Sequence, residues 1–253
     1  MTLSSTTPRP LIAGNWKMNG LSAALDEARA VAAGLDRRPA ASRVAIFPPA
    51  TLLHRLVQAV EGSFVLVGGQ DCHHKASGAN TGDVSAEMVA DAGGTLVICG
   101  HSERRTDHGE TSAQVAAKAE AALAAGLEPI ICVGETLDLR QSGQAVAYVL
   151  NQVRESLPAS LAGQAFNVAY EPLWAIGTGH TASVDNIVEM HAAIRAELVV
   201  LFGEQGRGVP ILYGGSVKPE NAREILAAPD VGGALVGGAS LKAKDFLAIV
   251  EAA

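Results

Sequence analysis

The chain has 253 residues, of which 48% are hydrophobic and 18% are charged, and its formal net charge is -7. This composition is typical of an ordinary globular protein with a sizeable core. The acidic balance argues against nucleic acid and anionic membrane surfaces as partners, and no apolar stretch reaches the ~20 residues that a membrane-spanning helix needs.

The three cysteines, Cys72, Cys99 and Cys132, form no regular framework. An odd number without paired spacing indicates a reducing compartment rather than a disulfide scaffold, and the short spacing of a zinc site is missing. We therefore expect a cytoplasmic protein without a metal. Cys99 and Cys132 each end an apolar run, which predicts small buried side chains.

Short apolar runs alternate with helical patterns along the whole chain. Residues 1–10 begin with a polar segment, which predicts a loose N-terminal tail. The predicted strands are 11–14, 44–47, 64–67, 96–99, 128–133, 166–170, 209–213 and 232–236. The predicted helices are 22–35, 50–60, 85–91, 111–125, two stretches within 136–156, then 184–202, 219–227 and 244–251.

These elements make eight strand–helix units of roughly 30 residues, near the size of a βαβ unit. The strands lack polar alternation, as expected for parallel strands that are buried on both faces. The pattern predicts an α/β fold, a single (β/α)8 barrel over residues 11–253. A doubly wound open sheet is the alternative, but it would more often carry a Gly-rich dinucleotide turn after the first strand, and none is present.

Polar residues follow most of the predicted strands. In a (β/α)8 barrel the active site lies at the carboxyl ends of the strands, so these residues are expected to converge on one face. They are Asn15, Lys17, Gln70, His101, Glu103, Glu135, Glu171, Ser216, Gly237 and Gly238.

Residues 166–179 combine a strand with a carboxylate at its end, Glu171, and a Pro172 that cannot continue a ladder. Trp174, Ile176 and a run of small residues follow. This arrangement predicts a catalytic base beneath a movable flap, residues 172–180. Taken alone, the same window also fits a simple turn with a solvated glutamate.

Two glycine pairs point to phosphate. Gly214-Gly215 and Gly237-Gly238 follow the seventh and eighth strands, where this fold commonly binds phosphate and where glycine lets backbone amides approach an anion. With Lys17 they would form a local positive patch on an acidic protein. His101 precedes a predicted helix start, whose partial positive charge disfavours a protonated imidazole.

Six stretches carry a specific resemblance: GNWKMNG, GHSERR, CVGE, AYEPLWAIGTG, YGGSV and LVGG. Together, and in this order, the chain resembles the triosephosphate isomerase family along essentially its whole length. The resemblance implies interconversion of dihydroxyacetone phosphate and D-glyceraldehyde 3-phosphate in glycolysis and gluconeogenesis, without a metal or an organic cofactor.

The resemblance also assigns chemistry to four residues. Glu171 would remove the proton next to the carbonyl, and a neutral His101 would polarise that carbonyl and move protons between the two oxygens. Lys17 and Asn15 would stabilise the negative charge of the enediolate.

Further positions follow from the same resemblance. Gly177, Ser216, Gly237 and Gly238 would bind the phosphate. Pro172, Leu173 and Trp174 would form one hinge of the flap, Tyr213 and Ser216 would contact the closed flap, and Ile176 would dry Glu171 and make it a stronger base. Glu103 would hold Lys17, Glu135 would brace Trp174, and Ser102, Cys132 and Leu235 would support the site.

The resemblance implies a homodimer in which Thr81 reaches the partner subunit's Asn15. Here the loop reads Asn80-Thr81-Gly82-Asp83, where the family more often has an aromatic before the threonine and a glutamate after it. The shorter Asp83 is expected to weaken pairing with Arg104 across the interface. His180 replaces the more usual lysine of the second hinge, and the pair His73-His74 is expected to be solvated or at the interface.

Two other functions fit the same fold. Another phosphosugar barrel enzyme is possible, but an aldolase would need a Schiff-base lysine on a central strand, and no predicted strand contains lysine. A non-catalytic binding or scaffold protein is the second alternative, which the loss of Glu171, His101 or Lys17 would favour; all three are present.

Overall fold

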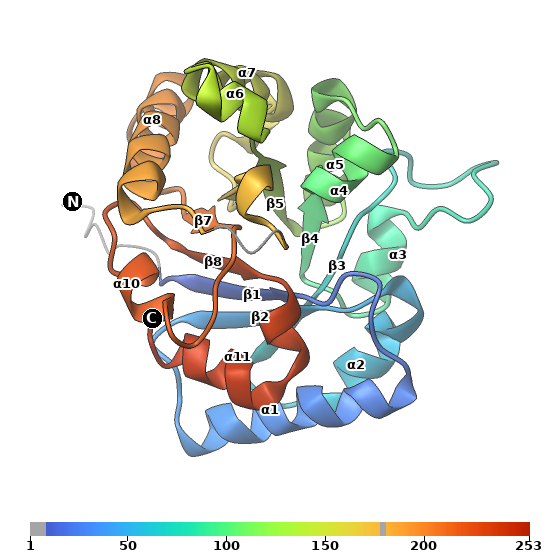
Figure 1. The fold of residues 1–253 in the computed structure, drawn as a ribbon. Helices are drawn as coiled ribbons and strands as arrows, with labels where there is room; N and C mark the ends of the chain where they lie inside the picture. The colour runs from blue at the N-terminus through green and yellow to red at the C-terminus, as the bar shows by residue number, and fades with distance from the viewer. Residues whose placement is uncertain (1–8, 178–180) are drawn as a thin grey trace, which may run out of the picture.

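A computed structural model describes residues 9–177 and 181–253 (Figure 1). The predicted tail over residues 1–8 and the hinge position His180 lie outside the described residues. Eight parallel strands close into one barrel in sequence order, which confirms the predicted fold. The strands are β1 Leu11–Asn15, β2 Arg43–Phe47, β3 Val65–Gly69, β4 Leu96–Cys99, β5 Glu128–Val133, β6 Asn167–Tyr170, β7 Ile211–Tyr213 and β8 Gly233–Val236.

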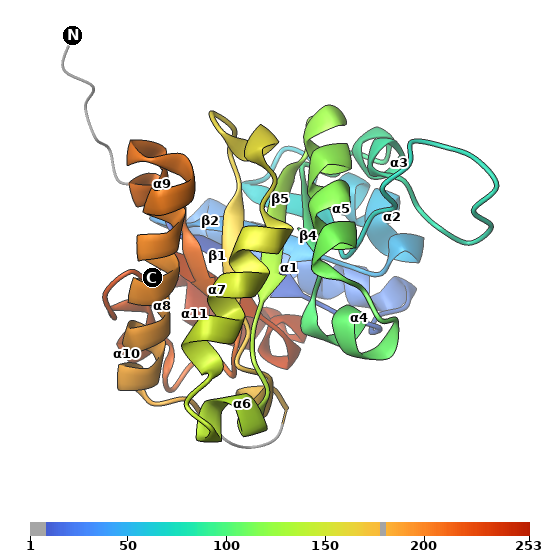
Figure 2. The ribbon, with the colours of Figure 1, turned by 90° about the horizontal axis from the view of Figure 1, so that it is seen from above.

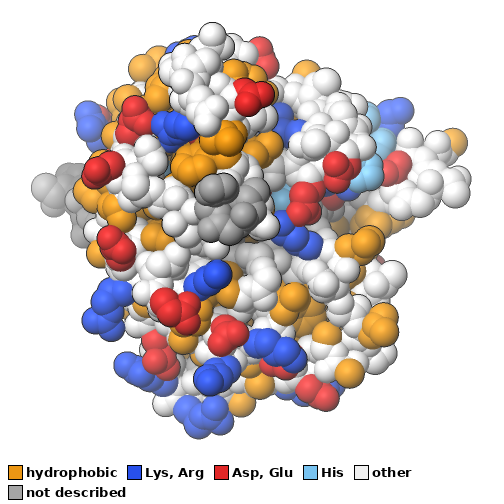
Figure 3. Space-filling view, in the orientation of Figure 1, with side chains coloured by type: hydrophobic (Ala, Val, Ile, Leu, Met, Phe, Trp, Pro, Cys, Tyr) orange, Lys and Arg blue, Asp and Glu red, His pale blue; other side chains and the backbone are white. Residues whose placement is uncertain are grey.

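Helices surround the barrel, as the view from above shows (Figure 2). They are α1 Leu25–Arg37, α2 Leu53–Ala59, α3 Ala86–Asp91, α4 Ser102–Asp107, α5 Ser112–Ala124, α6 Leu137–Gln141, α7 Ala145–Ser156, α8 Val184–Phe202, α9 Glu204–Gly208, α10 Ala222–Leu226 and α11 Ala243–Val250. On the face drawn in Figure 3, acidic and basic side chains lie intermingled.

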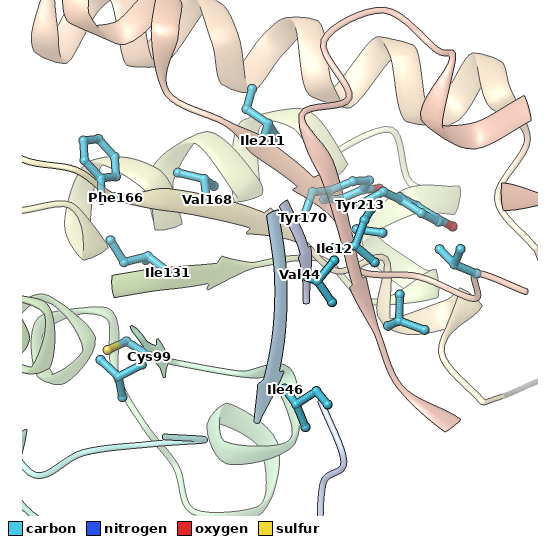
Figure 4. Close-up of a cluster of buried hydrophobic side chains, with 14 of the residues drawn as sticks. Ile12, Val44, Ile46, Cys99, Ile131, Phe166, Val168, Tyr170, Ile211 and Tyr213 are labelled. Carbon is cyan, nitrogen blue, oxygen red and sulfur yellow. The ribbon is translucent and has the colours of Figure 1, made fainter. Parts of the chain in front are cut away.

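The two-residue period of the strands separates two layers of core. Leu11 and Ala13 of β1 point into the barrel, as does Ala169 of β6, whereas Ile12 and Val168 point outward toward the helices. Figure 4 shows part of the outer layer. Successive side chains of a strand point to opposite faces. A residue that follows the end of a strand, two positions after an inward-pointing residue, therefore lies over the mouth of the barrel.

Several predicted boundaries differ from the structure. Strand β3 begins at Val65, and Phe64 is 66% exposed. Strand β7 begins at Ile211, after Pro210, which lacks the N–H that a ladder requires. Helix α10 begins at Ala222 rather than at the predicted residue 219; Pro219 instead occupies a turn before the helix.

Helix α9 was not predicted, because its sequence, EQGRG, contains two glycines and reads as a loop. The close approach of α9 to α8 requires glycine at position 206, because a Cβ there would lie 2.1 Å from the carbonyl oxygen of Leu198. The helix therefore forms where α8 ends because a bare backbone can approach α8 closely.

Candidate active site

Glu171 follows β6 directly and lies at the barrel mouth with only 1% of its surface exposed. Its backbone N–H donates to the Val133 carbonyl at 2.7 Å, which ties the base to β5. A Cβ on Gly134 would fall 1.8 Å from the Glu171 carbonyl oxygen, and one on Gly214 would fall 2.8 Å from Glu171 Cγ. The two glycines therefore leave the room that the base occupies.

The Glu171 carboxylate accepts three hydrogen bonds or ionic contacts from α4 and the residue before it. The Ser102 amide donates to Oε2 at 2.9 Å, the Ser102 hydroxyl donates to Oε1 at 3.1 Å, and His101 Nε2 lies 2.9 Å from Oε1. The structure therefore brings Glu171, His101 and Ser102 together at one point of the barrel mouth.

The tautomer of His101 follows from its second nitrogen. The amide of Glu103 donates to His101 Nδ1 at 3.2 Å, so Nδ1 is an acceptor and a neutral ring carries its proton on Nε2, facing Glu171. Burial lowers the pKa of His101, but the charge and hydrogen bond of Glu171 outweigh burial and raise it above the ordinary value. The Glu103 amide acts against that rise, because protonation of Nδ1 would break its bond.

The pKa of Glu171 differs from the sequence expectation. Burial raises it, but the charge and hydrogen bond of His101 and the amide of Ser102 lower it more, so the pKa lies below its ordinary value. In this geometry Glu171 is therefore a weaker base than a free glutamate, because hydrogen-bond donors outweigh burial. The strengthening expected once Ile176 covers the carboxylate has the opposite direction and stays a prediction.

Lys17 sits on an unusual backbone, with φ at 53°, in the left-handed region that few non-glycine residues adopt. Asn15 Oδ1 accepts from the Lys17 amide at 3.0 Å, and Gln70 Nε2 donates to the Lys17 carbonyl at 2.8 Å. Lys17 Nζ contacts Glu103 Oε1 at 2.5 Å, which agrees with the expected pair. Two side chains thus hold the strained segment in place.

A cavity of about 630 Å³ joins most of the predicted site residues. Among those lining it are Asn15, Lys17, His101, Glu171, Ile176, Gly177, Ser216, Leu235, Gly237 and Gly238. A Cβ on Gly237 would lie 3.5 Å from Lys17 Cε, so the lysine stem runs beside the second glycine pair. The space suits a small anionic ligand that meets a cation and bare backbone together.

The segment predicted to be the first hinge of the flap rests on Glu135, which is fully buried. Glu135 Oε1 accepts from Trp174 Nε1 at 2.9 Å and from the Tyr170 hydroxyl at 3.0 Å, and the Leu173 amide donates to the Glu135 carbonyl at 3.0 Å. Pro172 precedes a turn of 3-10 helix over Leu173–Ala175. The expected bracing of Trp174 by Glu135 is confirmed.

The expected latch residues also lie beside the flap. The Ser216 amide donates to the Ala175 carbonyl at 3.2 Å. Tyr213 is buried, and burial raises the pKa of Tyr213 to about 12 although the backbone of Ala182 lowers it. Ala175 and Ala182, which lie on either side of the undescribed residues 178–180, are therefore in contact with β7 or the segment after it.

Cys132 points into the barrel beneath Glu171 and is fully buried. Burial and the charge of Glu171 raise its pKa well above the ordinary value, so the thiol is protonated. Leu235 of β8 is also buried in this inner layer. Leu235 lines the cavity, and Cys132 packs in the layer beneath it, where both were expected to support the site.

Sequence reasoning missed Arg105, and it missed that Gly134 and Gly214 leave room for Glu171, although Gly214 was expected at the phosphate site. Arg105 donates to the carbonyls of Gly100 and Cys132 at 2.9 and 3.0 Å. It thereby joins the residue after β4 to the end of β5, beside the groups that contact Glu171. Burial lowers its pKa. The signal for the two glycines was their place directly after β5 and β7; Arg105 left no signal, since one arginine of GHSERR resembles another.

The loop between β3 and α3 projects from the barrel (Figure 1), and it exposes Thr81 and Asp83. Arg104 pairs within its own chain with Asp71 at 3.0 Å and Glu110 at 2.5 Å. The rings of His73 and His74 stack with centroids 4.3 Å apart. In residues 9–177 and 181–253, no group of three or more His, Cys, Asp or Glu could hold a metal ion, and no helix is long and apolar enough to cross a membrane.

The comparisons with known proteins agree with one another. The family model for triosephosphate isomerase matches residues 10–253. The triosephosphate isomerase of Caulobacter vibrioides is 84% identical over 252 residues and 100% of both chains, and that of Afipia carboxidovorans is 58% identical over 244 residues, 96% of this chain and 97% of the other. A crystal structure of triosephosphate isomerase from Bartonella henselae is 46% identical, with a TM-score of 0.90 over 97% of this chain and 99% of that chain. This chain belongs to the triosephosphate isomerase family.

Proposed function

We propose that the chain interconverts dihydroxyacetone phosphate and D-glyceraldehyde 3-phosphate through an enediolate, in glycolysis and gluconeogenesis. One observation carries the proposal: the buried carboxylate of Glu171 lies 2.9 Å from His101 Nε2, beside Lys17, in a cavity of about 630 Å³. A base, a hydrogen-bond donor and a cation at one point are what proton removal next to a carbonyl requires.

Glu171 is the proton-abstracting base. In the resting geometry His101 and the Ser102 amide lower its pKa below the ordinary value, although burial raises it. When the carboxylate exchanges these donors for the C–H of the substrate, burial remains and the donors no longer hold the charge. The pKa then rises, so the base gains strength only after it has moved to the substrate.

His101 takes over as the electrophile at the same moment. Its Nε2–H, freed from Glu171, donates to the substrate carbonyl, while Nδ1 keeps the amide of Glu103. This neutral-imidazole arrangement is a known feature of the family. As charge develops on the substrate oxygen, the same ring moves a proton from one oxygen to its neighbour, and Lys17 and Asn15 stabilise the oxyanion.

Gly177, Ser216, Gly237 and Gly238 bind the phosphate. Remote phosphate binding holds the triose so that its reacting carbon stays near Glu171. The flap, hinged at Pro172, Leu173 and Trp174 and latched at Tyr213 and Ser216, covers the cavity with Ile176. Exclusion of water protects the enediolate from losing its phosphate.

We further propose that the chain acts as a homodimer in the cytoplasm. The projecting loop exposes Thr81, and Met18, the residue after Lys17, is 97% exposed, which supports a partner surface beside the site. The three cysteines are free and buried, as expected for a reducing compartment.

The test combines turnover with isotope exchange. Purified protein should convert D-glyceraldehyde 3-phosphate to dihydroxyacetone phosphate, and in D₂O the product should carry deuterium at the carbon that received the proton, as read by NMR. Turnover without any deuterium in product or recovered substrate would exclude a base that exchanges with solvent. Absence of turnover with intact binding of a phosphate analogue would favour a binding protein instead.

The aldolase alternative is disfavoured by the strands themselves. None of the eight described strands contains a lysine that could form a Schiff base. Borohydride in the presence of substrate should therefore leave the mass of the protein unchanged.

A further inference from the structure

The charge of the protein opposes its substrate. The net charge is -7, and a phosphate monoester carries about two negative charges near neutral pH. Lys17 offers little attraction at long range, because its ammonium group contacts Glu103 at 2.5 Å and the pair is nearly neutral from a distance. Capture of the anion therefore needs a further positive charge near the mouth of the cavity.

Lys218 supplies that charge. It lines the same cavity, beyond β7 and before α10, and its side chain is exposed. Within the described part of the chain, no carboxylate oxygen lies within 4.0 Å of its ammonium group, in contrast to Lys17. Its full charge thus faces the solvent from which the substrate arrives.

The backbone fixes Lys218 beside the phosphate segment. The Lys218 amide donates to Asn221 Oδ1 at 2.8 Å, and Asn221 Nδ2 donates to the Ser216 carbonyl at 3.1 Å. One asparagine therefore links the lysine to the residue expected to bind phosphate. The charge is held near the cavity mouth even though the side chain itself is free to move.

Besides Glu171, two carboxylates that line the same cavity, Glu220 and Asp245, oppose this attraction. Asp245 lies in the first turn of α11, where the helix terminus offsets its charge, whereas Glu220 is exposed two residues after Lys218. Acidic and basic side chains are also intermingled over the face in Figure 3. The local field at the mouth thus depends on a few individual charges rather than on a large basic patch.

We propose that Lys218 steers the phosphorylated substrate into the cavity, raising the rate of association without taking part in the chemistry. Triosephosphate isomerases are among the enzymes whose kcat/KM approaches the diffusional ceiling. In that regime a single charge at the mouth changes kcat/KM directly, and salt screens the change because the Debye length is only about 10 Å at 0.1 M ionic strength.

The experiment measures kcat and kcat/KM of K218Q over a range of sodium chloride concentrations. At low ionic strength we expect kcat/KM to fall about two- to threefold with kcat unchanged, and the difference from the parent protein to disappear near 0.5 M salt. E220Q should shift kcat/KM in the opposite direction, and K218R should restore the parent value because it keeps the charge.

The matched control is R223Q, which removes an exposed cation of α10 that does not line the cavity. Its kcat/KM should stay within experimental error of the parent value. The proposal is overturned if K218Q and R223Q have equal effects, if the loss in K218Q persists at high salt, or if kcat falls with kcat/KM. The last two results would indicate a direct contact with bound phosphate.

Discussion

The two ends of the barrel use charged groups in opposite ways. At the amino ends of the strands, Arg43 of β2 forms a two-pronged pair with Glu128 of β5, at 2.9 and 2.6 Å, and Asn167 of β6 donates to the same carboxylate at 2.7 Å. At the carboxyl ends, Glu171 accepts from His101 and Ser102, and in the mechanism that we propose it leaves them to reach the substrate.

Both carboxylates have a lowered pKa, although burial raises each of them. Glu128 is held by a permanent cation and contributes to the fold, since its partners belong to strands. Glu171 is held by groups that have a second task. A buried charged residue whose hydrogen-bond partners are permanent contributes to the stability of the fold. One whose partners can be exchanged for a substrate is available for chemistry.

The largest expected effect is on kcat, from a change at the carboxyl ends of the strands. Replacement of Glu171 by glutamine keeps the shape and most of the hydrogen bonds but removes the base, so kcat should fall by about 10³ or more. Binding of glycerol 3-phosphate should stay within about threefold, because the residues that bind the phosphate are unchanged. Glu155→Gln, an exposed carboxylate of α7, is the matched control and should leave kcat as it is. If kcat fell less than tenfold in E171Q, Glu171 would not be the base.

The next largest effect is expected at the amino ends of the strands, on stability rather than on activity. Arg43→Ala leaves Glu128 only 17% exposed and without its cation, so the free energy of unfolding should fall by about 2–3 kcal/mol while kcat is retained. Urea denaturation at one fixed protein concentration measures it. Arg29→Ala breaks an exposed pair with Asp26 and should cost under about 1 kcal/mol. A large loss of kcat in R43A would show that the two ends are not separate.

The smallest effect is a pKa shift. The folded pKa of Glu171 lies below its ordinary value, so the stability it contributes is present above the unfolded pKa and is lost as pH falls through the folded value. Ser102→Ala removes the hydroxyl bond at 3.1 Å and should raise that pKa toward the ordinary value of a glutamate.

Carbon-13 NMR of glutamate labelled at its carboxyl carbon measures the shift, with the Glu171 signal identified by its absence from E171Q. Ser160→Ala, at an exposed hydroxyl, should leave the titration unchanged. An unchanged pKa in S102A would mean that the backbone amide of Ser102 and His101 alone hold the charge.

Much of the architecture followed from the sequence because it rests on local rules. Unbroken apolar runs indicated buried parallel strands, and period two then placed residues beyond the strand ends over the mouth. Glu171, His101 and Lys17 could be brought together in this way. The family resemblance, carried by motifs such as GHSERR, supplied their separate tasks.

What the sequence could not show depends on distances between remote segments. The donors around Glu171 that reverse the expected direction of its pKa shift come from α4, about 70 residues away along the chain, and hydrogen-bond geometry decides whether they outweigh burial. The open charge of Lys218 likewise depends on which side chains lie near it in space and left no signal in the sequence. Helix α9 was missed because close contact with α8 overrides the weak helix preference of its glycines.

Gly134 and Gly214 bear on how this barrel could be redesigned. Because a Cβ on either one would collide with Glu171, the base is confined by bare backbone on two sides, and neither position tolerates a new side chain. Efforts to alter substrate choice therefore have to keep these two glycines and work farther from Glu171, where Lys218, Glu220 and Asp245 line the cavity. The backbone of the barrel fixes the place of the carboxylate, whereas Lys218 and Glu220 stand at exposed positions that can be replaced.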